Sequence, residues 1–304
     1  MRLILVSGLS GSGKSVALHM LEDLDFYCVD NIPAALLTGL VSHIVRSSES
    51  VYQRTAVGVD ARNTRQEIAT VPALLQDLRA SGIGCELLFL TSSDDALLRR
   101  FAETRRKHPL SRGREGLREA IALERDLLEP VVQAADLVID TSNLGVHDLR
   151  ETIRMRVERR SQTRMSILFE SFGYKSGIPG DADFVFDARS LPNPYWEPSL
   201  RSLTGRDAAV ARFLQEQTGV ETLLGDISRF VEARIPEFRS SNRRYLTVAV
   251  GCTGGQHRSV YLVERIAADF AARHADVSIR HSGLPGTGIY APGTAPGIPA
   301  DLRA

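Results

Sequence analysis

The segment Gly8-Leu-Ser-Gly-Ser-Gly-Lys-Ser15 constrains the fold of this chain more than any other. It matches the pattern G-x-x-x-x-G-K-[ST] completely, follows the apolar run Leu3–Val6 and precedes the amphipathic stretch Val16–Leu24. In this context the glycines let successive backbone N–H groups point at phosphate oxygens, and the next helix adds its positive N-terminal end. The pattern therefore predicts a phosphate-binding loop between a buried strand and a helix.

This loop assigns chemical roles to two of its side chains. Lys14 is expected to neutralise the β and γ phosphates of a nucleotide, and the Ser15 hydroxyl to ligate Mg²⁺. The second metal anchor should be an acid at the end of a buried strand, and Asp60 is the first candidate for it. Asp30 and Asp140 also end apolar runs and stay as alternatives. Because no N-K-x-D guanine-reading motif occurs, the sequence does not choose between ATP and GTP by that route.

Short apolar runs alternate with amphipathic stretches through the first half of the chain. This rhythm predicts an α/β fold, with a parallel sheet that carries helices on both faces. We expect a kinase-like P-loop NTPase domain over residues 1–155. Its predicted strands are Leu3–Val6, Phe26–Val29, Thr55–Val59, Glu86–Leu90 and Leu137–Ile139, with helices such as Val16–Leu24, Thr64–Ala80 and Asp94–Lys107.

An arginine-rich stretch at residues 150–164 leads into a second set of elements, which predicts a second α/β, ligand-binding domain over residues 156–284. A solvated helix face is the favoured interpretation of these arginines, and a surface for phosphate-rich partners is the alternative. Residues 285–304 contain almost no large apolar side chains and are expected to be a disordered tail. The predicted elements of the second domain are strands Ile167–Ser171, Phe184–Asp187 and Tyr245–Val250, and helices Asp207–Arg234 and Ser259–Arg273.

Composition limits the possible partners and compartment. The 304 residues include 37 Lys+Arg and 37 Asp+Glu, so the formal net charge is zero, unlike that of a dedicated nucleic-acid binder. Three cysteines argue against a disulfide scaffold and favour a reducing cytoplasm. No export signal or membrane span is expected, because the N-terminal apolar run is short and no window is apolar over about 18 residues.

A second glycine-rich loop, Gly251–Ser259, lies between an apolar run and a helical pattern. Such a loop suits a phosphate group, to which Arg258 can offer a bidentate fork. The spacing Cys252-x5-Arg258 also matches the loop of cysteine phosphatases, in which the arginine and the helix end lower the thiol pKa. However, Gly251 precedes the cysteine where those enzymes typically have His.

Non-covalent binding of a phosphorylated ligand is therefore the favoured interpretation of this loop, with phosphatase catalysis and a structural turn as alternatives. A phosphatase would also need a general acid. Asp181, Asp183 and Asp187 are the candidates for that role.

Four arginines lie close together in the segment Leu97–Pro109. Their spacing resembles the arginine-bearing lid of small-molecule P-loop kinases, where such groups stabilise charge on a transferred phosphoryl group. The alternative is a charged helix surface. The four are Arg99, Arg100, Arg105 and Arg106.

Taken together, these segments resemble the RNase adapter family of bacterial P-loop proteins, of the RapZ type, over roughly residues 1–283. The two long C-terminal motifs are more specific than the phosphate loop. The matching segments are GLSGSGKS at 8–15, DFYCVDNIP at 25–33, GVDARN at 58–63, RRKHPL at 105–110, FESFGYKSGIP at 169–179, FVFDARSLPNPYW at 184–196 and GCTGGQHRSVYL at 251–262.

The resemblance implies ATPase and GTPase activity with Mg²⁺, and a C-terminal domain that senses a phosphorylated amino sugar. It implies that ATP binds Gly8, Leu9, Ser10, Gly11, Ser12, Gly13, Lys14 and Ser15, and that GTP binds Asp60, Ala61, Arg62 and Asn63. Lys14 and Asp60 are the expected catalytic residues, and Ser15 and Asp60 the expected metal ligands. The expected sugar-phosphate site consists of Asp187, Tyr195, Cys252, Thr253, Gly254, Gly255, His257 and Arg258.

Two segments depart from the family pattern. The aromatic-proline loop reads Asn193-Pro-Tyr195, where the family usually has His before the aromatic residue, which changes the hydrogen bonding available to a ligand. Enteric members end in a Lys/Arg-rich tail that binds RNA, whereas residues 282–288 here carry no charge. Since RNA affinity depends on neutralised phosphates, we expect only weak, nonspecific RNA binding.

These observations favour a cytoplasmic nucleotide-binding protein that hydrolyses ATP and GTP slowly and has a regulatory C-terminal domain. A small-molecule P-loop kinase and a non-catalytic RNA or protein adapter are the alternatives. We also expect a homo-oligomer, whose size the sequence does not give.

Overall fold

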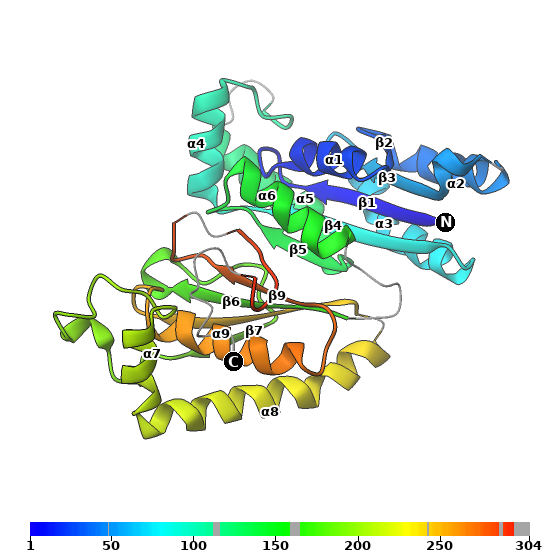
Figure 1. The fold of residues 1–304 in the computed structure, drawn as a ribbon. Coiled ribbons are helices and arrows are strands. Elements are labelled where there is room, and N and C mark those ends of the chain that lie inside the picture. The colour runs from blue at the N-terminus through cyan, green and yellow to red at the C-terminus, as the bar shows by residue number, and fades with distance from the viewer. Residues whose placement is uncertain (48, 112–115, 159–164, 242, 286–287, 295–304) are drawn as a thin grey trace. The chain divides into compact units, whose positions relative to one another are not determined.

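A computed structural model describes the whole chain except residues 48, 112–115, 159–164, 242, 286–287 and 295–304. The chain divides into two units, residues 1–154 and 155–304 (Figure 1). Each unit has one parallel β-sheet and a hydrophobic core of its own. The predicted fold class, a parallel α/β domain followed by a second α/β domain, is confirmed.

The sheet of the first unit has five strands in the order β2-β3-β1-β4-β5. Since β1 lies at the centre, the loop that follows it emerges between its neighbours β3 and β4, a place where parallel α/β sheets commonly bind ligands. The strands are β1 (Arg2–Gly8), β2 (Tyr27–Val29), β3 (Arg54–Gly58), β4 (Gly84–Thr91) and β5 (Leu137–Asp140).

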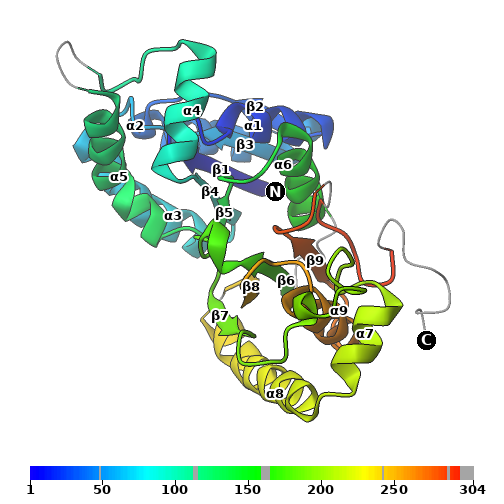
Figure 2. The same cartoon turned by 90° about the vertical axis from the view of Figure 1, so that its left-hand side faces the viewer.

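Helices cover both faces of this sheet (Figures 1 and 2). Leu3 and Leu5, which share one face of β1, pack in one cluster with side chains of α2, α3 and α5. Helices α1 and α6 pack against each other on the opposite face. The helices are α1 (Lys14–Asp23), α2 (Ala34–Arg46), α3 (Arg65–Ala80), α4 (Asp94–Thr104), α5 (Leu117–Gln133) and α6 (Val146–Ile153), with a 3₁₀ turn at Ser50–Gln53 and a π-helical turn at Arg154–Glu158.

Local sequence explains where helix α3 begins and where helix α4 ends. Helix α3 starts at a capping box, in which the Thr64 side chain accepts from Glu67 N and Thr64 N donates to the Glu67 carboxylate. Helix α4 stops at Thr104, three residues before the predicted end, because Arg105 adopts a left-handed φ of 51°. The segment after Arg105 is therefore free to turn back toward the first loop.

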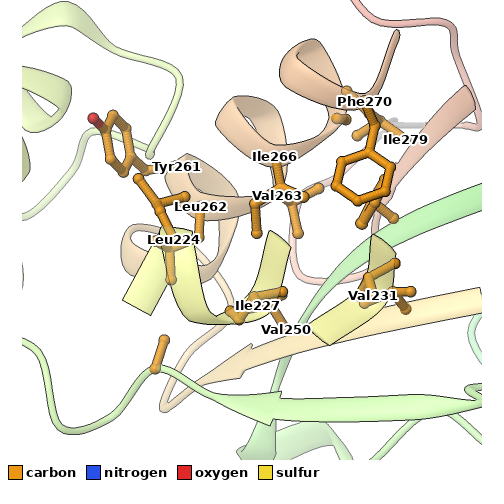
Figure 3. Packing of buried hydrophobic residues seen from close by; sticks show 14 of the residues in the cluster. Leu224, Ile227, Val231, Val250, Tyr261, Leu262, Val263, Ile266, Phe270 and Ile279 are labelled. Carbon is orange, nitrogen blue, oxygen red and sulfur yellow. The ribbon is translucent and has the colours of Figure 1, made fainter. Parts of the chain in front are cut away.

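The second unit contains four parallel strands in the order β7-β8-β6-β9. Three helices, α7, α8 and α9, form a hydrophobic core with one face of this sheet. In this core, side chains of α8 and α9 meet those of β8 and β9 (Figure 3). None of the helices in the described ranges is long and apolar enough to cross a membrane. The elements are β6 (Ser166–Gly173), β7 (Phe184–Asp187), α7 (Ala208–Gln215), α8 (Thr218–Ser240), β8 (Tyr245–Cys252), α9 (Arg258–Ala271) and β9 (Val277–His281), with 3₁₀ turns at Tyr174–Ser176 and Pro194–Trp196.

The long helical region predicted from Asp207 to about Arg234 consists of two helices and extends to Ser240. The structure has two helices there, because Gln217 has an extended backbone (φ −93°, ψ 116°) and its side chain donates to Phe213 O at 3.1 Å. The chain therefore turns between α7 and α8. The sequence analysis did not identify strand β9, which pairs with β6 on the side opposite β8.

The prediction of a disordered tail from residue 285 is wrong for the segment around Tyr290. Tyr290 pairs antiparallel with Ile279 of β9 through two backbone hydrogen bonds of 2.8 and 3.0 Å. Ile289 is 3% exposed and packs with Met155 and Leu168. Two large apolar residues within an otherwise Pro/Gly-rich tail thus suffice to fasten it to the sheet. Residues 295–304 lie outside the described residues.

We expect Tyr290→Ala to destabilise the second unit by about 3 kcal/mol or more, since it removes a buried ring. Tyr290→Phe should cost only about 1.5 kcal/mol, because it loses one hydrogen bond, from the phenol to Glu264 at 2.8 Å. Urea unfolding of the full chain, followed by fluorescence of the single tryptophan, Trp196, measures both. Wild-type stability in Tyr290→Ala would show that the tail does not support this unit.

Candidate functional site

The loop after β1 has a backbone that only glycine can adopt at two positions. Gly13 caps α1 with a left-handed φ of 105°, and a Cβ there would lie 2.5 Å from Leu149 Cδ2. A Cβ on Gly8 would lie 2.5 Å from the carbonyl oxygen of Leu90. The two glycines therefore allow the strand to end and the helix to begin within five residues.

Two carboxylates hold the ammonium group of Lys14. Its Nζ lies 2.8 Å from Asp60 Oδ2 and 2.9 Å from Asp30 Oδ1. The Asp60 side chain is 10% exposed and that of Asp30 is 48% exposed, so the first is part of the cavity wall and the second lies at its rim. Asp140, the other alternative, accepts instead from the backbone N–H of Ser142 at 2.9 Å. The structure thus brings both Asp60 and Asp30 to the phosphate loop.

The segment from Asp60 to Asn63 forms a tight turn rather than an open binding surface. Asp60 Oδ1 accepts from Arg62 N at 3.1 Å, and Asn63 Oδ1 accepts from Ala34 N at 2.6 Å, which caps the start of α2. Ala61 is 2% exposed and belongs to the core. Of these four residues, Asp60 and Arg62 face the same cavity as the first loop.

This cavity has a volume of about 560 Å³. All eight residues of the phosphate loop line this cavity. Ser15, in the first turn of α1, is exposed. The cavity walls also include Val16, Asp30, Asp60, Arg62, Arg100, Phe101, Glu103, Thr104, Arg106, Lys107, Pro109, Thr141, Leu144, Gly145, Val146 and Leu149.

The four arginines that resemble a kinase lid have different positions. Arg100 supports the loop backbone, since its Nη1 donates to Gly11 O at 3.1 Å and to Thr141 Oγ1 at 3.0 Å. Burial lowers the pKa of Arg100, and the nearby charge of Arg99 adds to this. Of the four, Arg100 and Arg106 line the cavity.

Lys107 also lines the cavity, and the sequence analysis did not assign it a role. One signal could have identified it. The chain carries only three lysines, at positions 14, 107 and 175, and relies on arginine for positive charge elsewhere.

The second unit repeats the strand–loop–helix arrangement with different residues. Strand β8 ends at Cys252 and helix α9 begins at Arg258. Asp187 pairs with Gly251, and Gly173 pairs with Cys252, so the ends of three parallel strands meet at this loop. The loop packs tightly on β6, since a Cβ on Gly255 would lie 2.6 Å from Gly173 N.

Cys252 is buried at the base of this loop, with its Sγ 3.2 Å from Ser259 Oγ. Burial raises the pKa of the thiol. Hydrogen bonds from the Ser259 side chain and from the backbone of Ser259 and Gly255, together with the charge of Arg258, lower it by more. The net pKa lies below the ordinary value of a thiol, which favours the thiolate relative to an ordinary cysteine.

Arg258 spans the loop, and one of its guanidinium donors has no partner among the described residues. Its Nη1 donates to the carbonyl oxygens of Arg189 and Leu191 at 3.1 and 2.9 Å, and its Nη2 donates to Thr253 Oγ1 at 3.3 Å. The Nε–H is buried and has no partner among the described residues. Nε–H and Nη2 share one edge of the guanidinium, and together they can donate to two oxygens of an anion.

Each candidate general acid is engaged by an arginine. Asp187 accepts from Arg189 Nη2 at 2.7 Å, and the side-chain hydrogen bonds from Arg189 keep the pKa of Asp187 below its usual range. Arg243 donates to Asp183 at 2.6 Å. Arg280 donates to Asp181 at 2.8 Å. Asp187, whose pKa is lowered, is therefore a poor proton donor.

Two of the expected sugar-phosphate residues have contacts of their own. The ring of His257, which is part of the loop, is directed at Leu200 O, 3.1 Å from Nε2, and burial lowers its pKa. Tyr195 is 46% exposed on a 3₁₀ turn outside the loop, with Arg201 over its ring at 4.9 Å. The loop also contains Cys252, Thr253, Gly254, Gly255 and Arg258, and Asp187 ends the adjacent strand.

Known protein families match the sequences of both units. A family model described as the RapZ-like N-terminal domain matches residues 1–161, and one described as the RapZ C-terminal domain matches residues 165–285. A nucleotide-binding protein of Alkalilimnicola ehrlichii is 53% identical over 283 residues, which are 93% of this chain and 98% of that protein. One of Thioalkalivibrio sulfidiphilus is 51% identical over 285 residues, covering 93% of this chain and 100% of that protein.

Among solved structures, shikimate kinase from Bacteroides thetaiotaomicron aligns with 52% of this chain and 98% of its own, at 13% identity and a TM-score of 0.37. The site and the curated relatives define a P-loop nucleotide-binding protein. Within that class, the chain belongs to the RapZ family, as the matches to both of its domains show. The resemblance seen in the sequence motifs is thereby confirmed.

Proposed function

We propose that the first unit binds a nucleoside triphosphate with Mg²⁺ and hydrolyses it slowly. The observation that carries this proposal is the convergence of Lys14, Asp60 and the complete phosphate loop on one cavity. Lys14 exchanges its carboxylate partners for the β and γ phosphates and neutralises charge that develops during hydrolysis. Because Lys14 must leave both carboxylates before it contacts the phosphates, slow hydrolysis is expected.

The residues around Lys14 suit a magnesium ion. Mg²⁺ prefers oxygen ligands, and the Ser15 hydroxyl with the Asp60 carboxylate offers them at the start of α1. Asp30 is a third oxygen donor, since it reaches the same ammonium as Asp60. When bound, the ion would neutralise phosphate charge and orient the terminal phosphate.

Lys14→Ala should slow ATP and GTP hydrolysis by about 10²-fold or more, because it removes a charge-assisted contact to the phosphates. Phosphate release under single-turnover conditions measures the rate. Lys175→Ala, which removes the same charge from the other unit, is the matched control and should hydrolyse at the wild-type rate. Unchanged turnover in a folded Lys14→Ala variant would contradict the assignment.

We further propose that ATP and GTP share one site. The family resemblance implies ATP at residues 8–15 and GTP at Asp60–Asn63, but both segments line the same cavity. Ala61 is buried and Asn63 is occupied as a helix cap, so the turn supports a separate nucleotide poorly.

GTP should therefore displace ATP competitively, with one nucleotide bound per chain. Displacement of a fluorescent ATP analogue by GTP, with calorimetric stoichiometry, measures this. Asp60→Asn should alter the affinity for both nucleotides. Two nucleotides per chain, or a loss confined to GTP, would show that the sites are separate.

For the second unit, we propose non-covalent binding of a small phosphorylated ligand at residues 251–259. Arg258 begins α9, and its buried Nε–H has no partner among the described residues, which supports phosphate recognition by Nε–H and Nη2. The lowered pKa of Cys252 would also suit a nucleophile, but the arginine-bound carboxylates leave the loop without an evident proton donor. The family resemblance suggests that the ligand is a phosphorylated amino sugar.

Arg258→Ala should weaken binding of a hexosamine 6-phosphate by about tenfold or more, since a bidentate charge-assisted contact is lost. Cys252→Ser should retain most of the affinity. Arg265→Ala, on the same helix but paired with Glu221 and Tyr261, is the control and should bind as wild type does. Calorimetric titration measures all four proteins. Phosphate-monoester hydrolysis that depends on Cys252 would instead establish catalysis.

A further inference from the structure

A buried carboxylate beneath the phosphate loop has no part in the function proposed above. Glu124 of α5 is fully buried and accepts from Ser10 N at 2.9 Å and from Ser10 Oγ at 2.7 Å. Its third partner is His108 Nε2, at 3.0 Å. An isolated buried carboxylate is costly, and these three donors stabilise it here.

The geometry around His108 defines its tautomer. The backbone N–H of Leu110 donates to His108 Nδ1 at 3.2 Å, so Nδ1 is an acceptor and Nε2 carries the proton given to Glu124. The imidazole side chain is fully buried, and its ring centroid lies 5.3 Å from that of Phe101. Both nitrogens are therefore used to fix the turn that begins at this histidine.

Two cations on the cavity wall directly precede this turn. Arg106 and Lys107 come immediately before His108, and both line the cavity that the phosphate loop also lines. Within the described part of the chain, neither forms an ion pair, although both side chains are exposed. Glu124 thus connects the loop that cradles phosphate to the segment that carries these two charges.

We propose that Arg106 and Lys107 bind the terminal phosphate of the nucleotide, and that Glu124 and His108 are positioning residues that hold them there. The inference rests on the proposed binding of a triphosphate at Lys14, but not on its hydrolysis. A diphosphate lacks the group that Arg106 and Lys107 contact. The pair therefore discriminates triphosphate from diphosphate.

The test compares the affinities of the full-length protein for the β,γ-imido analogue of ATP and for ADP, measured by titration calorimetry with Mg²⁺. Arg106→Ala/Lys107→Ala should reduce the preference for the triphosphate by about tenfold or more. His108→Ala should cause most of the same loss. Combining all three substitutions should add little, because the histidine acts through the two cations.

Further variants separate positioning from mere structural support. His108→Gln keeps a donor near Glu124 and should recover part of the preference. Glu124→Gln preserves the volume of the side chain and should lower the triphosphate preference as His108→Ala does. It replaces His108→Ala in the test if that variant does not fold. Arg125→Gln is the matched control, because it changes the next residue of α5, which pairs with Asp94 and not with the loop.

An unchanged triphosphate preference in folded Glu124→Gln or in Arg106→Ala/Lys107→Ala would overturn the inference. So would an equal loss of affinity for both nucleotides, which is what simple loosening of the loop would produce. A wild-type protein that binds the analogue but hydrolyses nothing would refute the proposed hydrolase and leave this inference intact.

Discussion

The structure depends on unpaired backbone N–H groups at the N-terminus of a helix that directly follows a parallel strand. The first N–H groups of any helix have no partner within it, and a glycine-rich turn aims them at one point. This chain builds that arrangement twice, at β1–α1 and at β8–α9. The two sheets, their cores and the surrounding charges keep these two points in place.

The two loops differ in how they treat the cation beside them. In the first unit the ammonium of Lys14 is bound between two carboxylates, so a phosphate must compete for it. In the second unit two main-chain carbonyls fix one Nη group of Arg258, and its Nε–H has no partner among the described residues. An arginine suits the second arrangement because its planar fork has separate edges, whereas an ammonium has no such division.

Local pattern allowed much of this to be predicted. The phosphate loop, the five strands of the first sheet and the loop at residues 251–259 follow from motifs and apolar runs that are contiguous in sequence. Strand β9 escaped because Arg280 and His281 occupy buried positions in it, and a five-residue strand with two such residues does not stand out. The contact of Glu124 with Ser10 joins residues 114 apart, and no local pattern predicts it. Likewise, only the folded structure shows that Arg100 donates to the loop backbone, while both Arg100 and Arg106 line the cavity.

The pairing of Tyr290 with Ile279 also affects how the second unit meets other molecules. Strand β9 lies at the margin of its sheet, where a row of unsatisfied main-chain groups invites pairing with a strand of another chain. By placing its own tail there, the chain occupies part of that margin. Chains cut before this residue would expose a longer free edge, so they should self-associate more readily than the intact protein.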